Sequence, residues 1–314
     1  MRAKIHATTT ALAALALSVA LAACKPTAPA RPADAGATPA DAATPAATAA
    51  PPAATAADDN LNAVLWVQRS AEYRANAISI FRAAADHLDA ALAEPEWDAL
   101  VPDEREQAAP AKGLAPAVIM DIDETVLDNS PYQARLVANG LEYDEVTWDQ
   151  WVAEKKARPV PGVLEFARAA EAKGVTVLYL SNRAVHLKEA TLANLRAAGL
   201  PVKDDSVFLG LGTHVEGCEQ NGSEKLCRRR LAGRVYRVLM QFGDQLGDFV
   251  EITANTPEAR AALLDEYDDW FGERWWMLAN PTYGSWEPAV FNNAWSEPRE
   301  ARRAAKRTAL QRDM

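Results

Sequence analysis

The stretch that decides the fold is Ala117-Val118-Ile119-Met120-Asp121-Ile122-Asp123-Glu124-Thr125. Its first four residues are apolar, which predicts a short buried strand. Asp121 and Asp123 would follow this strand at its carboxyl end, where open α/β sheets bind their ligands. Two carboxylates this close repel each other unless a cation lies between them, and Mg²⁺ accepts one or two carboxylates together with substrate phosphate. The stretch therefore predicts a metal site with one nucleophilic carboxylate and one that transfers protons.

Strand and helix patterns alternate after residue 160. Apolar runs predict strands at 175–180, 206–209, 236–242 and 275–278. Amphipathic patterns predict helices at 163–172, 187–198, 223–231 and 257–270. This alternation is typical of an α/β fold with a doubly wound parallel sheet covered by helices on both faces. Ahead of it, apolar residues spaced by three, four and seven predict one long helix over about 61–92.

The region between the aspartate-rich stretch and residue 160 is short. Residues 127–132 are predicted to form a turn, and a helical stretch begins at Thr147 and ends before Pro159. The length leaves no room for a large inserted cap domain. An acidic turn that caps a helix at 128–130 is the alternative interpretation of the aspartate-rich stretch.

The first residues are typical of a bacterial export signal. Arg2 and Lys4 precede an apolar run at 11–21 that is too short to cross a bilayer unaided. The run ends in Leu21-Ala22-Ala23-Cys24, which resembles a lipoprotein signal cleaved before Cys24 and lipidated there; an ordinary export signal is the alternative. We expect a signal peptide over 1–23, an Ala/Pro/Thr-rich tether over 24–57 and one folded domain over 58–314.

Composition limits the partners of the protein. The 314 residues carry a formal net charge of −10, so general binding to a nucleic-acid polymer is not expected. Export implies an oxidising compartment, in which Cys218 and Cys227 could close a disulfide around a Gly/Asn/Ser-containing loop. Two free thiols or a thiolate metal site are the alternatives. Lys25, after the cysteine, favours the outer membrane, facing the periplasm or the cell surface.

Polar residues follow three of the predicted strands. Asp121 and Asp123 follow the first, Ser181 and Asn182 the second, and Asp244 and Asp248 the third, with Lys225 at a predicted helix start between the last two. Carboxylates at two strand ends can hold Mg²⁺, and a hydroxyl, an amide and an ammonium can hold phosphate oxygens. Taken singly, each is explained as a helix cap, loop acid or exposed lysine; their order and placement favour phosphoryl transfer.

These motifs resemble those of the haloacid dehalogenase (HAD) superfamily, most closely the class C acid phosphatases of the lipoprotein 5′-nucleotidase type. The resemblance covers residues 61–286 and rests on 64–73, 121–130, 160–162, 181–183, 243–249 and 280–287. It implies a HAD-like, Rossmannoid fold whose N- and C-terminal flanking helices form a small roof.

The resemblance also implies a role for each motif residue. Asp121 attacks phosphorus, and Asp123 protonates the leaving group and later activates water. The Asp121 carboxylate, the Asp123 carbonyl and Asp244 would bind Mg²⁺, with Asp248 supporting them. Ser181, Asn182 and Lys225 would bind the phosphate.

Two aromatic residues are candidates for substrate recognition. Trp148 and Tyr283 resemble the ring pair between which the family stacks a base, whereas Trp151, Trp275, Trp276 and Trp286 are expected in the core. We expect an Mg²⁺-dependent 5′-nucleotidase acting on nucleoside monophosphates, including nicotinamide mononucleotide. A general or sugar-phosphate phosphatase, a phosphotransferase and a non-catalytic ligand-binding lipoprotein remain alternatives, and a homodimer is left open.

Overall fold

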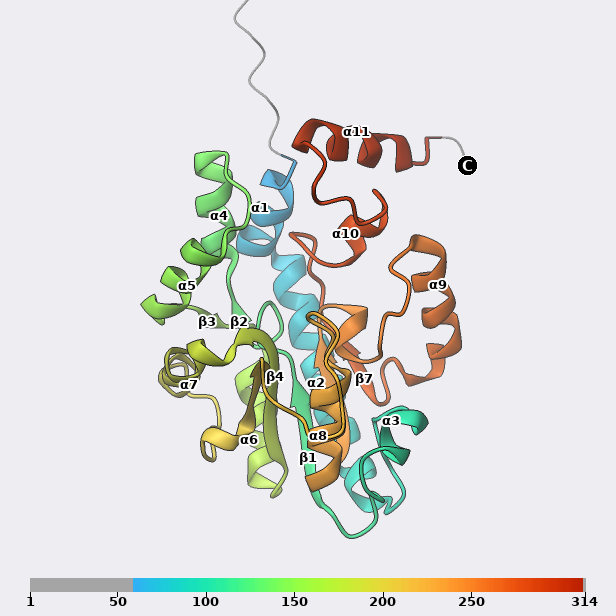
Figure 1. Cartoon of the computed structure of the whole chain (residues 1–314). Helices are drawn as coiled ribbons and strands as arrows, with labels where there is room; N and C mark the ends of the chain where they lie inside the picture. The colour runs from blue at the N-terminus through green and yellow to red at the C-terminus, as the bar shows by residue number, and fades with distance from the viewer. Residues whose placement is uncertain (1–58, 313–314) are drawn as a thin grey trace, which may run out of the picture. The chain divides into compact units, whose positions relative to one another are not determined.

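The computed structural model describes residues 59–312; the predicted signal peptide, the tether and Cys24 lie outside that range. A five-stranded sheet with the order β5-β4-β1-β6-β7 forms its centre (Figure 1). Every neighbouring pair of strands is parallel. The strands are β1 (Ala115–Met120), β4 (Thr176–Ala184), β5 (Phe208–Leu211), β6 (Tyr236–Gly243) and β7 (Trp275–Met277). The predicted doubly wound parallel sheet is confirmed.

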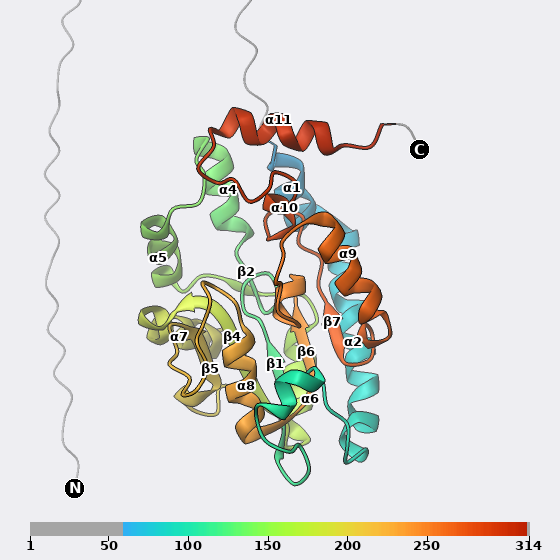
Figure 2. The ribbon, with the colours of Figure 1, turned by 45° about the vertical axis from the view of Figure 1, so that its right-hand side comes forward.

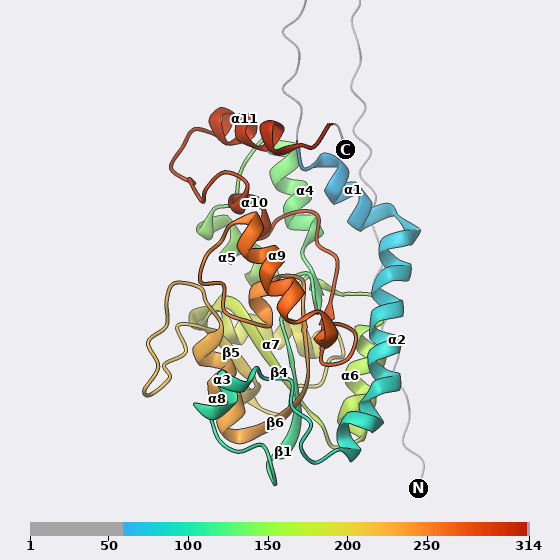
Figure 3. The ribbon, with the colours of Figure 1, turned by 90° about the vertical axis from the view of Figure 1, so that its right-hand side faces the viewer.

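Helices cover both faces of the sheet. Figure 3 shows α2 (Ala71–Ala93) and α6 (Val163–Ala172) on one side, with α3 (Pro102–Glu106) and α8 (Leu226–Val235) on the other. The remaining crossover helices are α7 (Lys188–Ala197) and α9 (Pro257–Glu266). None of the helices within the described range is long and apolar enough to cross a bilayer.

An aromatic cluster joins α2 and α6 to the sheet. The Phe242 ring on β6 stacks on Phe81 of α2 with 5.5 Å between centroids, and Phe166 of α6 lies 4.6 Å from it. All three side chains are almost completely buried. Burying aromatic side chains of this size supplies much of the free energy that holds the helices on the sheet.

The predicted single helix over 61–92 is interrupted. α1 (Leu61–Arg69) ends at Ser70, which has extended backbone, and α2 begins at Ala71. The Ser70 hydroxyl oxygen accepts a hydrogen bond from the Tyr73 backbone N–H at 3.0 Å and so caps α2. The apolar spacing continues across this break, which is why periodicity alone predicted one helix.

The end of the folded unit above the sheet brings together the first and the last helices of the described range. α1, α4 (Ser130–Asn139) and α11 (Arg299–Ala309) lie together in Figures 1 and 2, with α10 (Trp286–Ala289) nearby. This is the predicted roof. Arg302 pairs with Glu142 at 2.8 Å, and Arg303 with Asp59 at 2.8 Å, so α11 is tied to the segment after α4 and to the start of α1.

The segment after β1 holds more structure than the predicted turn. Two short strands, β2 (Leu127–Asp128) and β3 (Arg158–Pro159), pair antiparallel, and α4 and α5 (Glu145–Glu154) lie between them. The Asp128 side chain accepts from the Ser130 N–H at 2.8 Å, so the acidic stretch does begin a helix as well as form a site. Trp286 was expected in the core but is 42% exposed, whereas Trp151, Trp275 and Trp276 are buried.

Candidate active site

Three carboxylates gather at the carboxyl ends of β1 and β6, and we call them the acidic cluster: Asp121, Asp244 and Asp248. Each offers an oxygen within 4.8 Å of the others, and the side chains are buried. The Asp121 N–H donates to the Phe242 carbonyl at 2.9 Å, which extends the pairing of the two strands into the site. A Cβ at Gly243 would lie 2.3 Å from an Asp248 carboxylate oxygen, so glycine allows Asp248 to approach.

Lys225 lies among these acids. It precedes α8 and is buried, and its Nζ donates to the Asp121 carboxylate and, at 2.6 Å, to the Asp248 carboxylate. Burial raises the pKa of Asp121 well above its usual range, and the charge of Lys225 opposes that rise. The ammonium therefore stabilises the charged form of Asp121, which is the nucleophilic form.

The acidic cluster has the chemistry of a site for a hard divalent cation. Its three carboxylates supply oxygen ligands only, the type that Mg²⁺ prefers. Burial, followed by the charge of Asp248, raises the pKa of Asp244 to about 7, and a bound divalent cation would reverse that rise. The Asn280 and Gln245 amides each donate to Asp244 Oδ2 at 2.8 Å and orient it. The predicted ligands Asp121, Asp244 and Asp248 thus converge.

Asp123 lies beside the acidic cluster but has different partners. Arg183 donates to its Oδ1 through Nε at 2.9 Å and Nη2 at 2.8 Å, and Asn129 Nδ2 donates at 2.9 Å. The Ser181 hydroxyl donates to Oδ2 at 3.3 Å. Arg183 and Asn129 were missed by the sequence reasoning, although both lie within the motifs quoted for the family. Ser181 is on β4, so this strand brings a predicted phosphate ligand to the predicted proton donor.

The predicted stacking residues approach the site from two directions. Trp148 is half-buried on α5, and the Arg183 guanidinium carbon lies 5.5 Å from its ring centroid. Tyr283 donates its hydroxyl to the buried carboxylate of Glu124. No ring contact joins Trp148 and Tyr283 among residues 59–312, and the stacking role of the pair stays a prediction.

Glu124 is a third residue to which the sequence reasoning gave no role. It has a φ of 62°, in the left-handed region that is uncommon for residues other than glycine. The Asn129 N–H donates to its carboxylate at 2.7 Å, beside the bond from Tyr283. Burial raises the pKa of Glu124 well above its usual range. Such backbone strain is often found at functional sites, where surrounding contacts hold it.

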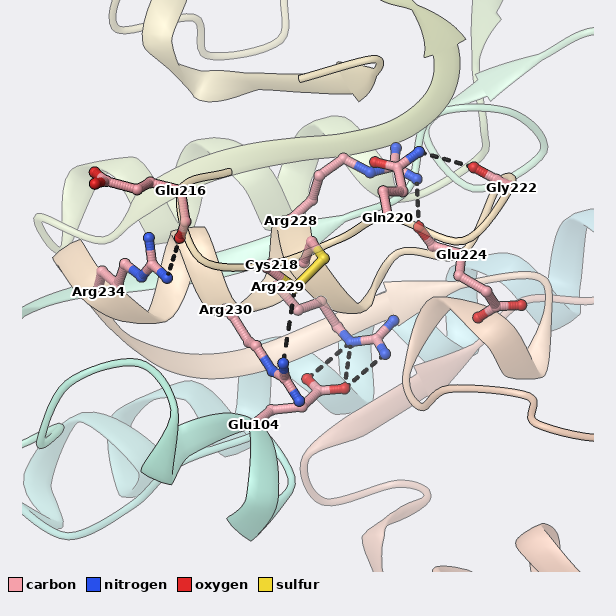
Figure 4. Close-up of a disulfide and its surroundings, with 11 residues drawn as sticks. Glu104, Glu216, Cys218, Gln220, Gly222, Glu224, Arg228, Arg229, Arg230 and Arg234 are labelled. Carbon is pink, nitrogen blue, oxygen red and sulfur yellow. Dashed lines mark hydrogen bonds and ion pairs between the residues drawn. A yellow bond between two sulfur atoms is a disulfide. The ribbon is translucent and has the colours of Figure 1, made fainter. Parts of the chain in front are cut away.

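The loop before α8 is closed by a disulfide between Cys218 and Cys227 (Figure 4). Cys227 lies two residues after Lys225, in the first turn of α8, so the bond ties the loop to the helix that follows the lysine.

Comparison with known proteins places this geometry in a family. Residues 40–286 match the model described as HAD superfamily, subfamily IIIB (Acid phosphatase). A class C acid phosphatase from Bacillus anthracis superposes with a TM-score of 0.69 and 29% identity, covering 81% of this chain and 98% of that one. Its crystal structure with tungstate bound gives a TM-score of 0.70 and 30% identity over the same shares.

Curated relatives match more locally. The similarity to "Acid phosphatase 1" of Solanum lycopersicum is 29% identity over 133 residues, and that to "Stem 31 kDa glycoprotein" of Glycine max is 27% over 132 residues. Each match covers 42% of this chain and 51% of the relative, so the chain spans about half the length of the curated relatives it matches. The family match and the Bacillus structures confirm the predicted resemblance. The chain belongs to the acid phosphatase family that forms subfamily IIIB of the HAD superfamily.

Proposed function

We propose that this protein is an Mg²⁺-dependent phosphomonoesterase that forms an aspartyl-phosphate on Asp121. One observation carries the proposal: the Asp121 carboxylate lies at a strand end among two more carboxylates and the buried ammonium of Lys225. That arrangement supplies a nucleophile and the positive charge that transferring phosphoryl oxygens require. Mg²⁺ held by the acidic cluster would neutralise negative charge on the phosphoryl oxygens.

The remaining groups suit the two steps of such a reaction. An Asp121 oxygen bonds to phosphorus while the bond from phosphorus to the ester oxygen breaks, and Asp123 gives that oxygen a proton. Asp123 then removes a proton from water, which attacks phosphorus and frees phosphate and the Asp121 carboxylate. The bonds from Arg183 and Asn129 to Asp123 Oδ1 leave Oδ2, next to Ser181, as its proton-transferring oxygen.

For the substrate, we propose nucleoside 5′-monophosphates, including nicotinamide mononucleotide. Trp148 and Tyr283 both contact groups next to Asp123. Trp148 lies beside Arg183, which donates to Asp123, and Tyr283 donates to Glu124, the next residue in the chain. Aromatic rings at such positions bind bases of several kinds because every base has a π-face. The tungstate in the Bacillus anthracis structure is a tetrahedral oxyanion like phosphate. It supports phosphate-ester chemistry but does not indicate which alcohol the phosphate is attached to.

The proposed setting is the outer membrane, where an anchor at Cys24 would hold the phosphatase in contact with exported nucleotides. This part rests on the sequence of residues 1–24, with their basic start, apolar run and Leu-Ala-Ala-Cys ending. Labelling cells with a radioactive fatty acid and purifying the protein tests it: wild type should carry the label, and Cys24→Ser should not.

Phosphate release tests the proposed activity. The full-length protein should release phosphate from nucleoside monophosphates in the presence of Mg²⁺, should lose this activity with a chelator, and should regain it when Mg²⁺ is restored. Asp121→Asn should abolish turnover, whereas Asp265→Asn, at an exposed position on α9, should leave it unchanged. Release only from an aryl phosphate would keep the chemistry and reject the nucleotide, and full activity in Asp121→Asn would reject the mechanism.

A further inference from the structure

Two consecutive arginines on α8 are fully buried, and only one of them has an acidic partner. Arg229 pairs with Glu104, with 2.6 Å between Nη2 and Oε1. Arg228 forms no ion pair with any carboxylate of residues 59–312. In Figure 4, Arg229 meets Glu104 and Arg228 points away from that pair.

Arg228 connects the strand of Ser181 to the start of α8. Its Nη1 donates to the Ser181 carbonyl at 2.6 Å, and its Nη2 donates to the Asn182 side-chain oxygen at 2.7 Å. Nη2 also donates to the carbonyls of Ser223 and Glu224, each at 3.1 Å. The guanidinium therefore holds both predicted phosphate-binding residues of β4 next to the segment that leads to Lys225.

The bond to Asn182 determines how its amide is turned. A guanidinium only donates hydrogen bonds, so the Asn182 atom that faces Arg228 is the oxygen. The amide NH₂ of Asn182 is then turned away from Arg228. Asn182 is exposed at the carboxyl end of the sheet. An NH₂ group turned outward at this point is a donor for an anionic oxygen.

The charge of Arg228 points to the same kind of ligand. Burying a cation without a counter-charge is unfavourable, and carbonyl oxygens offset this only in part. Burial, followed by the nearby charge of Arg229, lowers the pKa of Arg228 to about 10, although the charges of Asp121, Asp248 and Glu224 oppose that shift. Arg228 therefore remains a cation at neutral pH without a carboxylate of residues 59–312 in direct contact. An anion bound near the end of β4 would add a further counter-charge.

We propose that Arg228 is a positioning residue of the phosphate site, which turns the Asn182 amide toward the substrate and favours a phosphate dianion through a charge that forms no direct ion pair within residues 59–312. The inference rests on the proposed function, because it takes the phosphate of the substrate as the ligand. It adds a residue on α8 to the groups that bind this phosphate.

Calorimetric binding of inorganic phosphate to the full-length protein tests the proposal without requiring turnover. Arg228→Gln should weaken phosphate binding by roughly ten- to a hundredfold. This is the effect of losing one charge-assisted hydrogen bond, the one that the Asn182 amide would donate to phosphate. Arg228→Lys should weaken it less, because lysine keeps the charge and loses the two-pronged donor geometry. Arg230→Gln removes a charge from the same helix and should bind phosphate as wild type does. The Mg²⁺ concentration for half-maximal turnover should not change in any variant.

A double-mutant cycle separates positioning from general stability. If Arg228 acts through Asn182, Arg228→Lys should have little further effect on phosphate binding in an Asn182→Ala background. The cycle uses Arg228→Lys, so it still tests the proposal if Arg228→Gln does not fold. Additive losses in the cycle, or wild-type phosphate binding by folded Arg228→Gln, would overturn the inference.

The wild-type protein separates this inference from the proposed function. Phosphate binding without ester hydrolysis would reject the proposed function and leave the role of Arg228 standing. Hydrolysis by wild type together with unchanged phosphate binding in the Arg228 variants would reject only the role of Arg228.

Discussion

The acidic cluster and a group of three aromatic residues are built differently. We call Tyr132, Tyr143 and Trp148 the aromatic edge. Asp121, Asp244 and Asp248 are only 6%, 9% and 7% exposed. Asp121 and Asp244 directly follow β1 and β6, and Asp248 lies in the turn after β6. In the aromatic edge, Trp148 lies 5.2 Å from Tyr132 and 6.3 Å from Tyr143, which is 60% exposed. The groups proposed for chemistry are held by the sheet, whereas Trp148, one of the two residues proposed for recognition, lies on a small helical insertion between β2 and β3.

This difference predicts that substitutions behind the acidic cluster affect folding and catalysis, whereas those at the aromatic edge affect substrate choice. Rigid elements hold reacting groups more precisely than peripheral segments do. Four substitutions, taken from the largest expected effect to the smallest, test this division.

The buried Glu104–Arg229 pair should give the largest effect. Arg229 also donates to the carbonyls of Gly247 and Asp248, so the pair supports the acidic cluster. Glu104→Gln leaves a buried guanidinium without its counter-charge and should lower the free energy of unfolding by about 3–5 kcal/mol. Denaturant unfolding measures this change.

Glu142→Gln is the matched control, because Glu142 pairs with Arg302 but its side chain is 50% exposed. The loss there should be about 0–1 kcal/mol. Equal losses in the two variants would contradict the view that the acidic cluster is supported by a buried pair.

Lys225→Met should give the next largest effect. It removes the ammonium between Asp121 and Asp248 and leaves their charges to repel each other. Loss of one such stabilising donor should lower kcat by about a hundred- to a thousandfold. Steady-state kinetics measures the change, with Lys173→Met at an exposed ion pair as control; near-normal kcat in Lys225→Met would place the lysine outside the mechanism.

Trp148→Ala tests the aromatic edge. Loss of one stacking surface, worth about 1–3 kcal/mol, should raise KM for a nucleoside monophosphate by roughly five- to a hundredfold. KM for glycerol phosphate, which has no ring, should not change. Val146→Ala, at an exposed position on the same helix, is the control. An equal rise in KM for both substrates would favour a general phosphatase.

Ser70→Ala should give the smallest effect. The substitution removes the cap of α2, which precedes all the proposed reacting groups in the sequence. It should lower the free energy of unfolding by about 1 kcal/mol. Ser79→Ala, within the same helix, lacks a capping role and is the comparison in thermal unfolding. A fall in kcat in Ser70→Ala would show that the break between α1 and α2 matters for the site.

The sequence predicted what depends on local pattern. β1 is a continuous apolar run and β6 is largely apolar, and the acids that follow them converge because parallel strands present their carboxyl ends at one edge. The break at Ser70 was missed, because the apolar spacing continues through it. α4 was missed as well, since its first residues fall in a stretch that was interpreted as a turn.

Residues whose roles depend on distant partners could not be found from pattern. Arg183 and Glu124 stand inside the quoted motifs, but their bonds to Asp123 and Tyr283 appear only when separate segments come together. Arg228 is one of three consecutive arginines, a residue type that is mostly exposed in folded proteins, so nothing in the sequence indicated its burial. Its complete burial follows from the packing of α8 against β4 and β6.

The central claim is that Asp121 is phosphorylated during turnover. Its most direct test is acid quenching of the full-length protein within milliseconds of mixing it with labelled substrate and Mg²⁺, followed by mass spectrometry of its peptides. We predict phosphate on Asp121 in wild type and none in Asp121→Asn. Turnover with no phosphorylated peptide at any quench time, or with the phosphate on another residue, would contradict the account.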